Sequence, residues 1–287
     1  MDYRPFGNTG MKFSTVGLGG LLARYEARLG HPPPEEKQRI YRRAAELGVN
    51  LFDMGYGDEI HIPDELKGYH PDRFFALKAP LQEGLDLEAL VDKHLTNIRR
   101  DTIDVLRVLQ RPYREAHGFP QRIADLKQTG KIRSLCIVRH YPESQQAYAN
   151  DGPLPEADAD LVMYNYVFRD QEPGIELSAK AGKAVLIMKA LGGQWINWET
   201  MTQADWQGAT EDTVVQLAEA GEAMRVDAGL ILPVDAGPWQ DLARPGEARP
   251  RTARAISWVL ENPAVTSTLV AFASVEEVNE ALDDDAP

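Results

Sequence analysis

The chain has 287 residues and a formal net charge of −13, which argues against nucleic acid or an anionic membrane as its main partner. Hydrophobic residues make up 43%, enough for a large core, yet no apolar run approaches the ~18 residues that a membrane-spanning helix needs. The single cysteine, Cys136, excludes an internal disulfide framework, and the first residues lack a signal-peptide pattern, so we expect a cytoplasmic protein.

Short apolar runs alternate with longer amphipathic segments along the chain. The runs are rich in Val, Ile, Leu and Phe with little polar alternation, which is typical of parallel strands buried on both faces. Eight strands in series, separated by helices, predict a (β/α)8 TIM barrel that forms a single domain over residues 1–287, with an open doubly wound sheet as the alternative. We predict strands at 13–20, 50–55, 73–79, 103–110, 132–138, 159–166, 184–190 and 266–272, and helices at 35–48, 86–100, 119–131, 175–182, 253–263 and 274–282.

Residues 194–250 break this rhythm. They contain four of the five tryptophans and the Pro/Gly-rich stretch PVDAGPWQDLARPGEARP. We interpret them as a long insertion after strand 7, with a helix near 210–224. Long loops on a barrel often cover the active site, so we expect this insertion to contribute to the pocket.

The carboxyl ends of barrel strands face the active site, and this rule converts the strands into candidate site residues. The candidates are Asp53 and Tyr56 after strand 2, Lys78 after strand 3, Leu109 and Gln110 after strand 4, Arg139 and His140 after strand 5, Tyr164 and Asn165 after strand 6, and Met188 and Lys189 after strand 7.

Lys78 ends an apolar run, where an unpaired ammonium is costly to bury. Asp53, on the neighbouring strand, is the expected partner. A phenol beside this pair would have its pKa lowered from about 10 by the nearby cation, and Tyr56 could then donate a proton to a carbonyl oxygen. The alternative is a structural ion pair at the barrel rim with Tyr56 packed over it.

With these residues assembled, the sequence resembles the aldo-keto reductase superfamily over nearly its whole length. The opening YRPFGNTGMKFSTVGLGG is similar to the family's N-terminal β-hairpin and first strand, AAELGVNLFDMGYG to the segment with the catalytic aspartate and tyrosine, and FFALK to the strand that ends in the catalytic lysine. LTNIRRDTIDVLRVLQRP, LKQTGKIRSLCIV, VLIMKALGG and AISWVLENPAVTSTLVAFASVEEVNEAL follow in the family's order. The resemblance implies hydride transfer from a nicotinamide cofactor, usually NADPH, to an aldehyde or ketone, with Tyr56 as general acid assisted by Lys78 and Asp53.

Departures from the family pattern fall on the site. The loop between Asp53 and Tyr56 is two residues shorter than usual, and the histidine of strand 4 is replaced by Leu109 or by Gln110, depending on the alignment; Gln110 could still hydrogen-bond a carbonyl. Near the C-terminus, where basic residues normally hold the adenosine phosphate, Glu277 would repel a 2′-phosphate. The candidate cofactor contacts are Arg139, Met188, Lys189 and Ser274, and the candidate substrate contacts are His140, Tyr164 and Trp195.

Three functions remain open at this point. The first is a reductase that acts on a small-molecule carbonyl substrate with altered contacts to NADPH or NADH. The second is a non-redox enzyme for elimination, isomerisation or cyclisation on a barrel that has lost nicotinamide binding. The third is a non-catalytic binding protein that keeps the barrel. We expect no bound metal, because the histidines lack metal-ligand spacing, and the sequence does not predict an oligomeric state.

Overall fold

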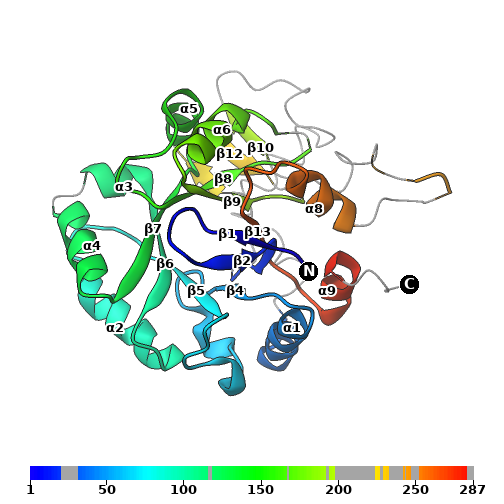
Figure 1. Cartoon of the computed structure of the whole chain (residues 1–287), viewed down its shortest axis with the longest axis horizontal. Coiled ribbons are helices and arrows are strands. Elements are labelled where there is room, and N and C mark those ends of the chain that lie inside the picture. The colour runs from blue at the N-terminus through cyan, green and yellow to red at the C-terminus, as the bar shows by residue number, and fades with distance from the viewer. Residues whose placement is uncertain are drawn as a thin grey trace.

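The computed structural model describes residues 1–20, 32–115, 118–166, 168–191, 194–197, 224–226, 229–232, 242, 244–246 and 252–282. Eight parallel strands form a closed barrel, because β13 pairs with β3 on one side and with β9 on the other (Figure 1). The barrel and its eight strands confirm the fold predicted from the sequence. The strands are β3 (Val16–Leu18), β4 (Leu51–Asp53), β5 (Phe74–Lys78), β6 (Ile103–Leu109), β7 (Ile132–Val138), β8 (Ala159–Met163), β9 (Ala184–Met188) and β13 (Ser267–Val270).

Helices surround the barrel (Figure 1). The six helices predicted outside the insertion are present: α1 (Pro34–Glu46), α2 (Leu87–Ile98), α4 (Phe119–Gln128), α6 (Glu172–Lys180), α8 (Thr252–Leu260) and α9 (Val275–Leu282). The structure adds α3 (Gln110–Glu115), α5 (Pro142–Asp151) and two 3-10 turns, η2 (Asp58–His61) and η3 (Asp64–Leu66). None of the helices in the described ranges is long and apolar enough to cross a membrane.

An antiparallel hairpin, β1 (Tyr3–Pro5) and β2 (Lys12–Ser14), precedes the barrel, as the family resemblance implied. Its apolar side chains enter the amino-terminal end of the barrel. The Phe13 ring lies 4.4 Å from the Phe6 ring and 4.9 Å from the Phe74 ring, measured between centroids. These rings and Met11 join the cluster that fills the barrel interior. The hairpin therefore covers the end opposite the strand carboxyl termini.

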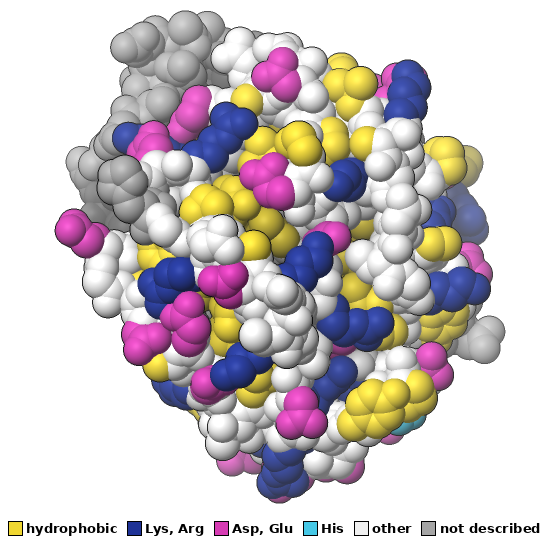
Figure 2. All heavy atoms as spheres, turned by 60° about the vertical axis from the view of Figure 1, so that its left-hand side comes forward, with side chains coloured by type: hydrophobic (Ala, Val, Ile, Leu, Met, Phe, Trp, Pro, Cys, Tyr) yellow, Lys and Arg dark blue, Asp and Glu magenta, His cyan; other side chains and the backbone are white. Residues whose placement is uncertain are grey.

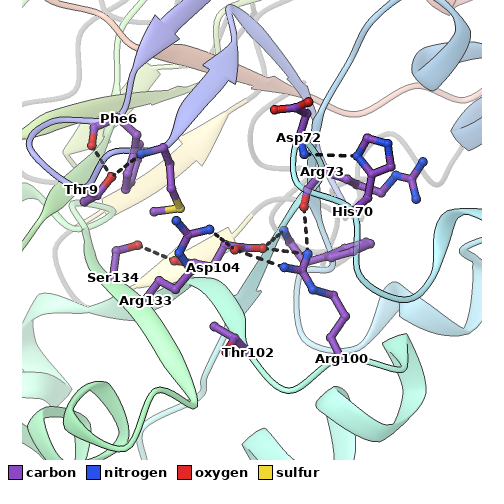
Figure 3. A network of polar contacts seen from close by, with 12 residues as sticks. Phe6, Thr9, His70, Asp72, Arg73, Arg100, Thr102, Asp104, Arg133 and Ser134 are labelled. Carbon is purple, nitrogen blue, oxygen red and sulfur yellow. Dashed lines mark hydrogen bonds and ion pairs between the residues drawn. The ribbon is translucent and has the colours of Figure 1, made fainter.

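A buried carboxylate links three strands near the same end (Figure 3). Asp104 on β6 is fully buried and accepts a hydrogen bond from Phe75 N at 2.9 Å. It also forms ion pairs with Arg100 and Arg133, each at 3.1 Å. Burial raises the pKa of Asp104, while the two guanidinium groups oppose that rise. The network fixes the register of β5, β6 and β7 below the site.

Charged side chains of both signs are interspersed on the face drawn in Figure 2. Ion pairs between neighbouring elements are consistent with this mixture. Arg122 of α4 pairs with Glu88 of α2, and Lys131 pairs with Asp92 of α2. Such exposed pairs contribute little to stability, typically about 0–1 kcal/mol each.

The insertion after β9 contains a three-stranded antiparallel sheet of β10 (Gln194–Asn197), β12 (Gly229–Leu232) and β11 (Met224–Val226). Its strands are joined in the order β10-β12-β11. The helix predicted near 210–224 lies outside the described residues as far as 223, and Met224 begins β11.

Candidate active site

Alternate residues of each barrel strand point into the interior, and this parity selects the side chains at the mouth. On β6 the interior set includes Val105 and Leu109, and on β7 it includes Cys136 and Val138. Arg107 has the same parity as Val105 and Leu109, and it pairs in register with Lys78, the last residue of β5. We call Asp53, Tyr56, Lys78, Arg107 and His140 the mouth site.

Asp53 ends β4 and forms an ion pair with Arg107, whose Nη2 donates a hydrogen bond to the Asp53 Oδ1. The same oxygen accepts a hydrogen bond from Gly55 N at 2.8 Å. Both charged side chains are buried, each residue being 5% exposed. The predicted ion pair between Asp53 and Lys78 is therefore wrong, because a guanidinium two strands away reaches the carboxylate from inside the barrel.

Tyr56 lies over Lys78 despite the shortened loop. The Lys78 Nζ is 4.9 Å from the centroid of the Tyr56 ring, and Tyr56 is 43% exposed. Backbone hydrogen bonds hold the loop: Lys78 N donates to Gly55 O at 2.7 Å, and Gly57 N donates to Met54 O at 2.9 Å. Gly55 has φ of 52°, which glycine adopts without strain. The phenol and the amine thus share the open end of the barrel.

The electrostatics of Lys78 and Tyr56 differ from the sequence prediction. Burial, followed by the nearby Arg107, lowers the pKa of Lys78 to about 8, and Asp53 only partly opposes this. Burial raises the pKa of Tyr56, with Arg107 acting in the opposite direction. The predicted lowering of the Tyr56 pKa is therefore wrong. Its desolvation outweighs the charge of Arg107, so Tyr56 keeps its proton at neutral pH.

His140 follows β7 and occupies one of the alternate positions whose side chains face the barrel interior. It is the predicted substrate residue that the structure brings to the mouth. Burial, then the charges of Lys78, Lys189 and Arg107, lower its pKa to about 3. The imidazole is neutral at physiological pH and can donate one N–H and accept one hydrogen bond. The Gln145 side chain donates to the His140 carbonyl at 3.2 Å and fixes the backbone there.

The structure decides between the two alignments of strand 4. Leu109 is the last residue of β6, belongs to the interior set and is partly exposed. Gln110 has the opposite parity, begins α3 and is 7% exposed. The position expected to hydrogen-bond a carbonyl is therefore Leu109, which cannot do so, and the catalytic assignment of Gln110 loses its geometric basis.

Two further predicted contacts lie behind the sheet rather than at the mouth. Arg139 is 1% exposed, donates from Nε to Asp160 Oδ1 at 2.6 Å and lies over the Tyr148 ring of α5. Tyr164 is also buried, and its ring packs 5.3 Å from that of Trp258 in α8. Both residues occupy the alternate strand positions whose side chains face the surrounding helices. For this reason, the cofactor role predicted for Arg139 and the substrate role predicted for Tyr164 are both corrected.

The other predicted contacts lie near the end of β9 and in the insertion. Met188 is partly exposed and packs against the interior cluster. Lys189 adopts φ of 64°, and its carbonyl accepts a hydrogen bond from Asn165 Nδ2 at 3.0 Å. Trp195 lies in β10, opposite Ile231 of β12, and its side chain is outside the described part of the chain.

The amino terminus of α9 is occupied by the protein's own acidic and polar groups. Ser274 Oγ accepts a hydrogen bond from Glu277 N at 3.3 Å, and Glu277 Oε2 accepts one from Ala273 N at 2.7 Å. Glu36 of α1 accepts another from Val275 N at 3.0 Å. These amides are the donors that an anion at a helix N-terminus would need. A phosphate here would also face two carboxylates, so the described residues do not fit a 2′-phosphate.

Sequence reasoning missed Arg107, which pairs with Asp53 and, after burial, is the second cause of the lowered pKa of Lys78. Its signal was available: it is the one cation inside the apolar run of β6, two residues before Leu109. A charged side chain with interior parity needs a buried partner. Strand alternation alone could have suggested that Arg107 competes with Lys78 for Asp53.

No protein-family model matches the sequence, and no curated protein matches it. Solved structures of aldo-keto reductases are similar to it. One from Pseudomonas aeruginosa has 19% sequence identity and a TM-score of 0.63, over 98% of this chain and 93% of that one. The holo form of AKR11C1 from Bacillus halodurans has 18% identity and a TM-score of 0.65, over 100% and 92%. One from Klebsiella pneumoniae, in complex with NADPH, has 15% identity and a TM-score of 0.62, over 98% and 89%. At these identities the likeness confirms the predicted fold.

Proposed function

We propose that this protein is an oxidoreductase that reduces the carbonyl group of a small molecule at the mouth site, with Tyr56 as proton donor. The proposal is carried by one observation, the Lys78 ammonium 4.9 Å from the centroid of the Tyr56 ring at the carboxyl ends of β4 and β5. The fold that this chain shares with the aldo-keto reductase structures supports a nicotinamide as the hydride source. A bound nicotinamide would supply the hydride.

Tyr56 would act as general acid. Its raised pKa keeps the hydroxyl protonated at neutral pH, and its partial exposure leaves the hydroxyl open to a substrate oxygen. As negative charge develops on that oxygen, the Tyr56 O–H donates its proton. The ammonium of Lys78, 4.9 Å from the ring centroid, and the charge of Arg107, which favours the ionised form of Tyr56, stabilise the phenolate left behind.

His140 would orient the carbonyl in place of the missing histidine of strand 4. Leu109 cannot donate a hydrogen bond, whereas the neutral His140 imidazole on the next strand has one N–H. Asp53 would act through Arg107, since it anchors the guanidinium and accepts the Gly55 amide that fixes the Tyr56 loop. Asp53 is thus a positioning residue in this scheme.

The described residues fit a nicotinamide without a 2′-phosphate better than one with it. The partly exposed Met188 offers an apolar surface at the mouth on which a flat ring could pack. The α9 amides, in contrast, already bind Ser274, Glu277 and Glu36. We therefore propose NADH as the preferred cofactor.

Titration with NADH and NADPH, followed by turnover with a panel of aldehydes and ketones, tests this function. We expect NADH to bind more tightly than NADPH and to support turnover. Tyr56→Phe should bind NADH like the wild type and lose at least about 100-fold in kcat, the range of general acid catalysis. Absence of binding for both nucleotides at millimolar concentration would overturn the proposal and leave the non-redox alternative.

A further inference from the structure

The amine of Lys78 has lost the carboxylate that its position makes available. The Oδ1 of Asp53 is already bonded to Arg107 and to Gly55 N. Within the described residues, the Lys78 Nζ forms no hydrogen bond or ion pair with a carboxylate. It contacts the ring of Tyr56. Lys78 is only partly buried, so a small molecule entering the mouth can reach it.

Arg107 is suited to keep Asp53 away from Lys78. A guanidinium stays charged at any pH at which the protein folds, and its planar donors hold a carboxylate in fixed geometry. Arg107 and Lys78 are register partners on adjacent strands, so the two cations also lie side by side. A lysine next to another cation and partly shielded from water is the environment that produces a nucleophilic amine.

We propose that Lys78 is a carbonyl-capturing amine, which forms a Schiff base with an aldehyde or ketone bound at the mouth site. This activity needs no nicotinamide. It uses the same carbonyl substrates as the proposed reduction but does not depend on that reaction. The ligand class is a small aldehyde or ketone whose carbonyl carbon can reach Nζ between the side chains of Tyr56 and His140.

The reaction balances without an oxidant or reductant. The lone pair of Nζ attacks the carbonyl carbon, and the carbonyl π electrons move to oxygen, which takes a proton from Tyr56. The nitrogen then loses a proton to the Tyr56 phenolate. In the second step the carbinolamine hydroxyl leaves as water with a proton from Tyr56, and the C=N bond forms as a protonated iminium. The nitrogen then returns its remaining proton to the Tyr56 phenolate, which leaves the neutral imine. The net change is amine plus carbonyl giving imine plus water.

Burial, together with the neighbouring charges, sets how much free amine is present at Lys78. With a pKa of about 8, about a quarter of Lys78 is unprotonated at about pH 7.5, against roughly 0.1% for a lysine at the ordinary 10.5. The exposed Lys93 on α2 provides an internal comparison. Free-amine content alone therefore favours capture at Lys78 over an ordinary lysine by about 200-fold.

Reductive trapping tests the proposal on the full-length protein. The protein is incubated with propanal and cyanoborohydride, without nicotinamide, and the alkylated lysines are identified by peptide mass spectrometry. We expect Lys78 to be alkylated at least about 50-fold faster than Lys93, with a rate that rises through a midpoint near pH 8. Lys78→Arg should remove the fast phase, and Lys93→Met should keep it. Equal rates at Lys78 and Lys93 would overturn the proposal.

The ion pair provides two variants with opposite expected effects. Arg107→Met releases Asp53 to pair with Lys78, so the alkylation midpoint should move to higher pH. Asp53→Asn removes the opposing anion and leaves Arg107 beside the amine, so the midpoint should move to lower pH. If the pH midpoint of alkylation is unchanged in the variants that fold, the role given to the ion pair is contradicted. Rapid trapping without turnover on NADH would refute the proposed reduction alone, and turnover without rapid trapping would refute this inference alone.

Discussion

The buried ion pair between Asp53 and Arg107 makes a specific prediction about stability. Replacing Arg107 by methionine removes the guanidinium and leaves a carboxylate that is 5% exposed. Breaking a buried pair by removing one partner typically costs about 3–5 kcal/mol. Asp53 keeps its hydrogen bond from Gly55 N, and Lys78 lies on the adjacent strand as a substitute cation. We therefore expect Arg107→Met to lower the free energy of unfolding by about 3 kcal/mol, the lower end of that range.

The double variant Asp53→Asn/Arg107→Met separates the pair from ordinary packing. It leaves no uncompensated charge at the pair. Its loss of unfolding free energy should therefore be smaller than the sum of the losses in the two single variants, by a coupling energy of at least about 1 kcal/mol. Urea unfolding at pH 7, followed by circular dichroism, measures all four proteins. A loss below about 1 kcal/mol in Arg107→Met, or strict additivity in the double variant, would refute the assignment of Asp53 to Arg107.

Three further predictions concern pH, cofactor choice and the loop of Tyr56. Folding lowers the His140 pKa from 6.5 to about 3, so as the pH falls the unfolded chain binds a proton at His140 before the folded protein does. The free energy of unfolding should therefore fall as the pH drops from 6.5 towards 3. Measured by urea unfolding, the His140→Gln variant should lose less stability over this range. Glu277→Lys should raise the affinity for NADPH relative to NADH by about tenfold, measured by fluorescence titration, and an unchanged ratio would contradict the assignment of the α9 end to the adenosine phosphate. A Cβ at Gly20 would lie 2.7 Å from Gly55 N and displace the loop, so Gly20→Ala should lower kcat by roughly 10–100-fold in steady-state turnover, while wild-type activity in a folded variant would count against the loop's role.

The sequence was sufficient to predict the barrel. Apolar runs buried on both faces identified all eight strands, and strand ends identified Asp53 and Lys78. The helix α5 was missed because its sequence, PESQQAYAND, is polar over most of its length and has no regular apolar stripe. Its start depends on local contacts, such as the Ser144 hydroxyl that accepts from Tyr141 N at 3.2 Å.

The side-chain partners were harder to predict than the strands. Arg139 and Tyr164 were assigned to the mouth because they follow strand ends, but a shift of one residue moves a side chain to the other face of a sheet. Asp53 was assigned to Lys78 because the two strands are neighbours, although Arg107 reaches the carboxylate across the interior. Such choices depend on side-chain length and direction, which spacing along the sequence does not specify.

Transfer of deuterium from NADH labelled at C4 of the nicotinamide tests the central claim most directly. With an aldehyde substrate, the account predicts one deuterium at the former carbonyl carbon of the alcohol product in the wild type, and loss of that transfer in Tyr56→Phe. A product formed without deuterium from the cofactor, or a transfer that proceeds at the wild-type rate in Tyr56→Phe, would contradict it.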